Sequence, residues 1–161
     1  MYKNIYPITN EVAFEVTSQL SDDDKRECIE GNGIDPFTLA FEILSGPENY
    51  VVKSPNGMSV ALGGVDPDGR IWLLCTDKIK HYPVTFTRNI KDFVDSRPEK
   101  LLWNVVDKRN TTHIKLLRFL GFKFLREVLH GPNLLTFIEF CKINARNSDR
   151  YGSTDCPQLL R

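Results

Sequence analysis

The sequence has no glycine between Gly69 and Gly121, although the chain of 161 residues contains 10 glycines. It also lacks a CxxC pair and any cysteine near a histidine at metal-ligand spacing, which argues against a zinc site. No apolar run approaches the roughly 20 residues of a membrane-spanning helix. The opening residues MYKNIYPITNE lack the apolar core of a signal peptide, so we expect the cytoplasm of whichever cell makes the protein.

The chain carries no excess of either charge, because Lys plus Arg and Asp plus Glu both number 21. A neutral chain lacks the overall positive charge of a general nucleic-acid binder. Apolar residues make up 41% and charged residues 26%, which is typical of a globular protein with one hydrophobic core. Cys75 lies inside an apolar stretch, where a cysteine usually acts as a small buried apolar side chain.

Apolar stretches separated by turn residues predict the strands. The turns SPNG (54–57) and DPDG (66–69) are strong hairpin signals and imply an antiparallel meander. The expected strands are 4–9, 49–54, 58–65, 70–76, 101–106, 122–129 and 134–143.

Amphipathic spacing and capping residues predict the helices. Ser21 before DDDKRE is an N-cap followed by acidic residues in the first turn. Asp35 and Pro36 open another helix, and Asn110 precedes a short helix that Gly121 ends in the left-handed conformation. A further helix from Pro83 links the strands 70–76 and 101–106, so these two are expected to lie parallel.

The order of elements is therefore β, α, α, α, β, β, β, α, β, α, β, β. We predict one α+β domain over residues 1–144, with a mixed, mostly antiparallel sheet of about six or seven strands flanked by helices. Residues 145–161 are polar and irregular and are predicted to be a C-terminal tail.

The segment RNTTHIKLLRFLGFKF and this order resemble the GCN5-related N-acetyltransferase superfamily. Members often carry N-x-x-A-x-x-x-Y-x-x-x-G-F, which Asn110, Gly121 and Phe122 match. The resemblance implies that the fourth and fifth strands splay apart at one end, with the pantetheine arm of acetyl-CoA between them. It implies contacts to that cofactor from Leu74, Cys75, Thr76, Asn104 and Asn110 if the protein is active.

The chain departs from that family at two places. Leu117 stands where members have a tyrosine that protonates the leaving thiolate, and a leucine cannot donate a proton. The turn CTDKIKHYPVTFTRN lacks the glycines that bring the family's backbone N–H groups to the pyrophosphate at a helix N-terminus. We therefore expect no bound cofactor and no catalysis; acetyl-CoA is the cofactor if the protein is active.

A longer pattern resembles the acetyltransferase-like internal virion proteins of short-tailed phages (podoviruses). It consists of GMSVALGGV, DGRIWLLCTD and LLWNVVDKRNTTHIKLLRFLGFKF. The resemblance implies a role in particle assembly or inside the virion, with other virion proteins as partners. The expected location is then the virion or the host cytoplasm.

Two polar residues of the last third are candidates for a site. His113, at the start of the helix, is the only candidate base for an acyl transfer, but the sequence places no carboxylate near it to orient the ring. A local helix-flanking role is the simpler interpretation. Asn104 interrupts an apolar strand, so it either lines a cleft between splayed strands or ties down the adjoining turn.

A basic cluster surrounds the same helix: Lys108, Arg109, Lys115, Arg118, Lys123 and Arg126. It is typical of a solvated helix face, and the alternatives are contacts to coenzyme phosphates, an acidic protein or packaged DNA.

Overall fold

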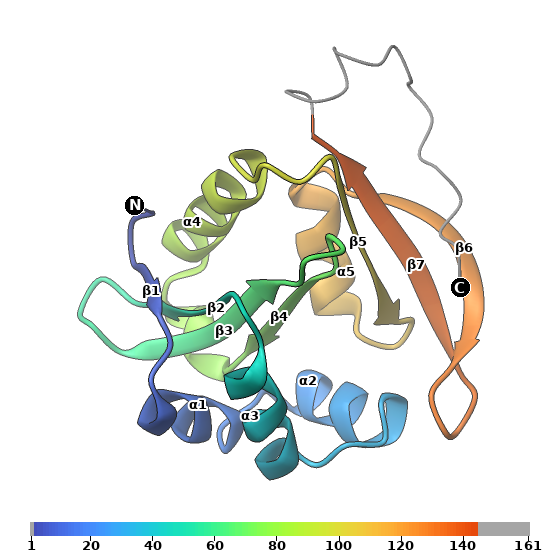
Figure 1. Cartoon of the computed structure of the whole chain (residues 1–161), viewed down its shortest axis with the longest axis horizontal. Helices are drawn as coiled ribbons and strands as arrows, with labels where there is room; N and C mark the ends of the chain where they lie inside the picture. Colours follow the sequence, from blue (N-terminus) through green and yellow to red (C-terminus); the bar gives the residue numbers. More distant parts are fainter. Residues whose placement is uncertain (1, 145–161) are drawn as a thin grey trace.

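The computed structural model describes residues 2–144, which form two sheets covered by helices (Figure 1). The strands are β1 Ile5–Pro7, β2 Asn49–Lys53, β3 Ser59–Val65, β4 Ile71–Cys75, β5 Leu101–Asp107, β6 Lys123–His130 and β7 Leu135–Ile143. The helices are α1 Asn10–Thr17, α2 Asp22–Arg26, α3 Pro36–Ser45, α4 Pro83–Asp95 and α5 Thr111–Phe119. A π-helical turn, η1 (Glu27–Gly31), continues α2, and a 3-10 helix, η2 (Asp77–His81), follows β4.

The strands form two antiparallel sheets that meet along β4 and β5. One sheet has the order β1-β2-β3-β4 and the other has the order β5-β7-β6. A single parallel bridge between Arg70 and Trp103 connects them. The predicted α+β class and the parallel direction of the fourth and fifth strands are therefore confirmed. The predicted tail 145–161 lies outside the described residues.

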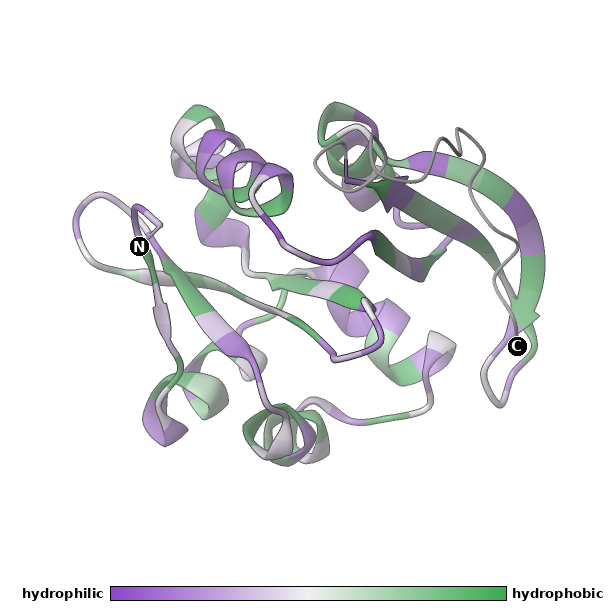
Figure 2. Ribbon diagram, turned by 45° about the horizontal axis from the view of Figure 1, so that its top comes forward, coloured by the Kyte–Doolittle hydropathy of each residue, from purple (hydrophilic) through white to green (hydrophobic). Residues whose placement is uncertain are grey.

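Apolar side chains from both sheets and from two helices make the main core. Phe86, Ile90 and Phe93 of α4 and Leu117 of α5 belong to it, which explains the apolar spacing of both helices. A smaller cluster lies on the opposite face of the first sheet, which α1 and α3 cover. Val16 of α1 and Ile43 of α3 pack there against Val51 and Leu62 of the sheet. Figure 2 shows the apolar residues concentrated in the strands and on one side of the helices.

The helix ends follow the sequence signals. The side chains of Ser21, Asp35 and Asn110 each accept a hydrogen bond from a backbone N–H in the first turn of α2, α3 and α5. Gly121, with a φ of +88°, follows α5 in the left-handed conformation. These local signals fix where each helix starts and stops, and with them the position of the helices beside β4 and β5.

Candidate functional site

The strands β4 and β5 are joined at their starts. The backbone N–H of Trp103 donates to the carbonyl of Gly69 (3.1 Å), and its indole N–H donates to the carbonyl of Asp68 (3.0 Å). One residue further along, the Asn104 Nδ2 donates to the carbonyl of Ile71 (2.8 Å). Asn104 therefore fastens β5 to β4. It lines neither cavity described below.

The same strands are apart at their ends, where α2 and η1 lie between them (Figure 1). The last residue of β4, Cys75, donates its N–H to Asp24 Oδ2 (2.7 Å), and its carbonyl accepts from the N–H of Ser21 (2.9 Å). The last residue of β5, Asp107, donates its N–H to Glu27 Oε1. Two carboxylates three residues apart thus clamp the ends of both strands.

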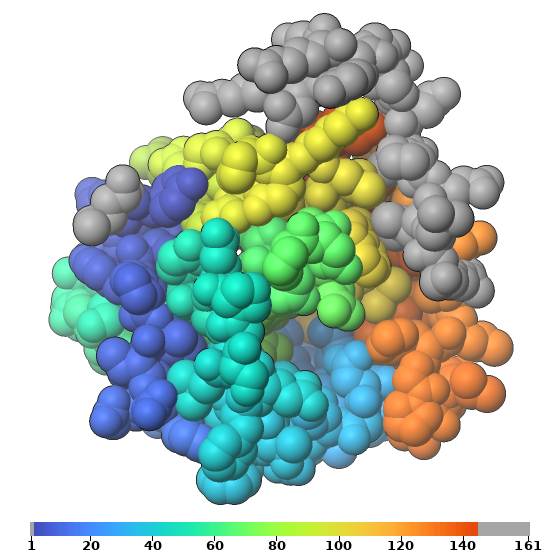
Figure 3. Space-filling model, viewed as in Figure 1, coloured from blue at the N-terminus to red at the C-terminus, as the bar shows by residue number. Residues whose placement is uncertain are grey.

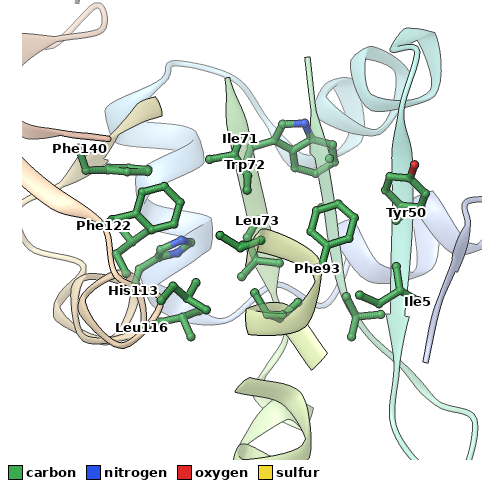
Figure 4. A pocket seen from close by; sticks show the side chains of 17 residues that line it. Ile5, Tyr50, Ile71, Trp72, Leu73, Phe93, His113, Leu116, Phe122 and Phe140 are labelled. Atoms are coloured by element: carbon green, nitrogen blue, oxygen red, sulfur yellow. The ribbon is translucent and has the colours of Figure 1, made fainter. Parts of the chain in front are cut away.

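A cleft of about 600 Å³ opens at this parted end. Its wall contains the start of α2, the end of β4 with η2, and the first turns of α4 and α5. Charged groups of both signs face it, among them Asp24, Asp77, Lys80 and Lys115. A smaller apolar cavity of about 50 Å³ lies behind it, and His113 and Leu116 line both spaces. Figure 4 shows these two side chains beside Phe122, across from Leu73 and Phe93.

His113 has a carboxylate partner, contrary to the expectation from the sequence. Its Nδ1 lies 3.7 Å from Asp24 Oδ1, which is an ion-pair distance but too long for a hydrogen bond. Burial lowers the pKa of His113, yet the charges of Asp24 and Glu27 act in the other direction and raise it above its usual value. The sequence could not reveal this pair because 89 residues separate the two positions.

Asp24 connects three elements. Besides its contacts to Cys75 and His113, its Oδ1 accepts from Asn110 Nδ2 (2.8 Å), and the Asn110 Oδ1 accepts from the N–H of His113 (3.2 Å). Burial raises the pKa of Asp24, but the neighbouring His113, the Cys75 N–H and the Asn110 amide together hold it below its ordinary value. Asp24 is therefore an ionised carboxylate at neutral pH, satisfied on both oxygens.

Glu27 is the second carboxylate of the clamp, and its environment differs. Burial raises its pKa to about 7, with Asp24 and Asp107 adding to the rise and His113 and the Asp107 N–H opposing it. Asp107 itself pairs with Arg109, which also reaches Glu30 on η1. The ends of β5 and η1 are thus joined by a second set of polar contacts.

The residues suggested by the resemblance fall into two groups. Cys75, Thr76 and Asn110 line the cleft together with His113. Leu74 points to the opposite face of the sheet and packs against the cluster under α1 and α3. The hydroxyl of Thr76 already has hydrogen-bond partners within the chain. It donates to the Val60 carbonyl (2.8 Å) and accepts from the N–H of Lys78 (3.3 Å).

Asp24 and Glu27 are the site residues that the sequence reasoning missed. The segment DDDKRE by itself predicts only an acidic first turn. Asp24 lies four residues before Cys28 in the continuous segment of α2 and η1, and both residues are buried. A carboxylate on the apolar side of a helix needs a buried partner, so this spacing was the available signal.

The turn after β4 has no glycine-lined backbone loop. Its residues form η2, and α4 then begins with Pro83, which has no N–H to offer. Leu117 is buried in the core. Within residues 2–144, no group of three or more His, Cys, Asp or Glu side chains is placed to hold a metal ion. In that part of the chain, no helix has both the length and the apolar character needed to cross a bilayer.

Solved structures with the same arrangement are acetyltransferases. An acetyltransferase of the GNAT family from Bacillus anthracis matches with a TM-score of 0.63 and 12% identity, over 89% of this chain and 96% of that chain. One from Bacillus cereus gives 0.63 and 13%, over 89% and 98%. Spermidine N-acetyltransferase from Vibrio cholerae, solved with CoA and spermine, gives 0.62 and 10%, over 88% and 95%. At these identities the likeness shows the fold alone.

The sequence itself matches a phage family. No curated protein matches it, but the family model described as "Bacteriophage T7, probable scaffold protein Gp13" matches residues 49–129. That range runs from the start of β2 almost to the end of β6 and includes both ends of the β4–β5 pair. Because it spans 81 of the 161 residues, just over half of the chain, this protein belongs to the bacteriophage T7 Gp13 probable scaffold family.

Proposed function

We propose that this protein acts in phage particle assembly or as an internal virion component, by binding other virion proteins and without acyl transfer. The observation that carries the proposal is the clamp at the ends of β4 and β5. Both backbone groups of Cys75 that face the gap are bonded to Ser21 and Asp24. A pantetheine arm between the strands needs such groups for its amides, and here the chain has already satisfied them.

Two further features support this proposal. The start of α4 offers Pro83 in place of an N–H donor, which weakens a helix N-terminus as a phosphate site. Leu117 supplies no proton for a departing thiolate. The family match gives the phage context, and the virion or the host cytoplasm is the location that we propose. The tail 145–161 and the basic cluster around α5 are the proposed contact regions, for virion proteins first and for packaged DNA second.

Isothermal titration calorimetry of the full chain with acetyl-CoA, and with coenzyme A as comparison, tests the absence of cofactor binding. We expect no heat of binding at ligand concentrations up to about 1 mM, above which affinity has little meaning for such a cofactor. Micromolar binding of acetyl-CoA would overturn the proposal. In a complementation assay, a chain that ends at residue 144 should fold normally but yield fewer particles than the full chain.

An active N-acetyltransferase is the second candidate, and the cleft with the His113–Asp24 pair favours it. An amine would attack the thioester carbonyl directly, His113 would accept the proton of the ammonium group, and the expelled thiolate would take a proton from water. The raised pKa of His113 works against this role, since it increases the protonated fraction of the imidazole at a given pH. Release of free thiol from acetyl-CoA in the presence of amines, lost in His113→Gln, would establish this function.

A further inference from the structure

The charges of the chain are unevenly distributed although their sum is zero. Residues 4–52 contain ten Asp and Glu against two basic residues, which gives a formal net charge of −8. Residues 53–144 contain fifteen Lys and Arg against nine Asp and Glu, a net charge of +6. Two parts of opposite charge in one chain give each copy the electrostatic complement of another.

An acidic aromatic face lies in the first of these parts, on α1 and α3. Phe14, Phe37 and Phe41 pack edge to face or tilted, with ring centroids 5.1 to 5.4 Å apart. Phe37 is 64% exposed and Phe41 is 53% exposed, although apolar rings of this size usually lie in cores or interfaces. The face is completed by three exposed glutamates on the same two helices: Glu11, Glu15 and Glu42.

A basic face lies in the second part, on α5 and the start of β6. It consists of Lys115, Arg118 and Phe119 on α5 and of Lys123 at the start of β6, and Phe119 is 54% exposed. Arg118 also lies over the ring of Phe124 at 5.5 Å. Figures 1 and 3 show that α1 and α3 occupy a different side of the molecule from β6.

The charged groups of both faces are available. None of the three glutamates and none of the three basic residues forms an ion pair with another residue between 2 and 144. Some other exposed charges are paired within the chain, for example Lys108 with Glu127 and Lys91 with Asp95. Each face therefore combines exposed aromatic surface with like charges that form no ion pair within residues 2–144.

We infer that the acidic aromatic face binds the basic face of a second copy of this chain. The contact joins two different surfaces, so it is head-to-tail and each copy keeps one face of each kind free for the next. Phe37 and Phe41 supply the apolar centre against Phe119, and the three carboxylates surround it opposite the three cations. This contact goes beyond the function proposed above and does not need the tail. It uses part of the basic cluster proposed there as a contact region, and its Lys115 and Phe119 also line the cleft.

Sedimentation velocity of the full chain at about 20 mM and about 500 mM salt tests the contact, because exposed charge pairs are screened at the higher concentration. The wild type should form oligomers that grow with protein concentration at low salt and dissociate at high salt. Phe37→Ser should weaken association at least about tenfold at the low salt concentration. A wild type that stays monomeric at low salt overturns the inference.

Charge reversal supplies the decisive control. One variant carries Glu11→Lys, Glu15→Lys and Glu42→Lys, and the other carries Lys115→Glu, Arg118→Glu and Lys123→Glu. Each should be monomeric alone, because both of its faces then have the same sign, and an equimolar mixture should associate again. All six positions are exposed, so circular dichroism is expected to match the wild type. A mixture that stays monomeric, or a variant that still associates alone, contradicts the head-to-tail contact.

Discussion

The two ends of the β4–β5 pair differ in the partners that form hydrogen bonds with the backbone of the strands. At the joined end, Gly69 and Trp103 bond through their backbones and Asn104 adds a short side-chain bridge. At the parted end, Cys75 and Asp107 bond to the carboxylates of a helix that comes from the first part of the chain. A gap between strands thus remains stable without a ligand when the chain itself supplies the missing acceptors. The variants below test the two ends independently, beginning with the one expected to lower the free energy of unfolding most.

Asp24→Ala should be the most damaging change at the parted end. It leaves the Cys75 N–H and the Asn110 amide without acceptors and removes the carboxylate that faces His113. Loss of one partner from such a buried charged network costs about 3–5 kcal/mol of the free energy of unfolding. Urea denaturation measures it. Asp23→Ala is the matched control, since its pair with Arg26 is exposed and should contribute about 1 kcal/mol or less.

If Asp24→Ala and Asp23→Ala lowered stability equally, the clamp would not hold the strand ends. Tight binding of coenzyme A by Asp24→Ala but not by the wild type would show, in addition, that the clamp keeps the gap closed to that ligand.

Gly69→Ala tests the joined end. Gly69 has a φ of +87°, and an added Cβ would lie 2.1 Å from the Leu101 carbonyl oxygen, so the approach of the two strands depends on the missing side chain. Backbone strain and the clash together should cost about 2–4 kcal/mol. Gly57 has the same φ but nothing within 4 Å of its added Cβ, so Gly57→Ala should cost only about 1 kcal/mol. Equal thermal shifts for the two variants would contradict this view.

The joined end was largely predictable from the sequence and the parted end was not. The DPDG turn, the apolar strand runs and the crossover helix are local signals, and they place β4 beside a parallel β5. The clamp depends on partners 51 and 80 residues apart, for Asp24 with Cys75 and Glu27 with Asp107. No periodicity connects such positions. The helix caps Ser21 and Asn110 were predicted because each acts within four residues of its own position.

Glu27→Gln should change how stability depends on pH. Folding raises the pKa of Glu27 from 4.5 to about 7, so the folded state holds a proton that the unfolded state loses. The free energy of unfolding should therefore fall as pH rises from 4.5 to 7, by about 2–3 kcal/mol from this group. The glutamine side chain still accepts a hydrogen bond from the Asp107 N–H but does not titrate. The free energy of unfolding of the variant should therefore fall less between pH 4.5 and pH 7 than that of the wild type.

Urea denaturation at pH 4.5, 6 and 8 would show this difference, with Glu30→Gln as a control at an exposed carboxylate of the same turn. His113 contributes with the same sign, since its raised pKa stabilises the fold at low pH, and Asp24 contributes with the opposite sign. If the free energy of unfolding fell as much with rising pH in Glu27→Gln as in the wild type, the pH dependence would come from His113 and not from Glu27.

Asn104→Ala should have the smallest effect, at the joined end. It removes the donor to the Ile71 carbonyl and the acceptor for the Val105 N–H, and one such partly buried hydrogen bond contributes about 1–2 kcal/mol. Asn104→Asp sharpens the test, because the carboxylate keeps the acceptor but faces the Ile71 carbonyl without a donor. It should therefore be the less stable of the two variants in urea denaturation. The reverse order would mean that the bond to Ile71 contributes little and that the contacts of Trp103 with Gly69 and Asp68 join the sheets.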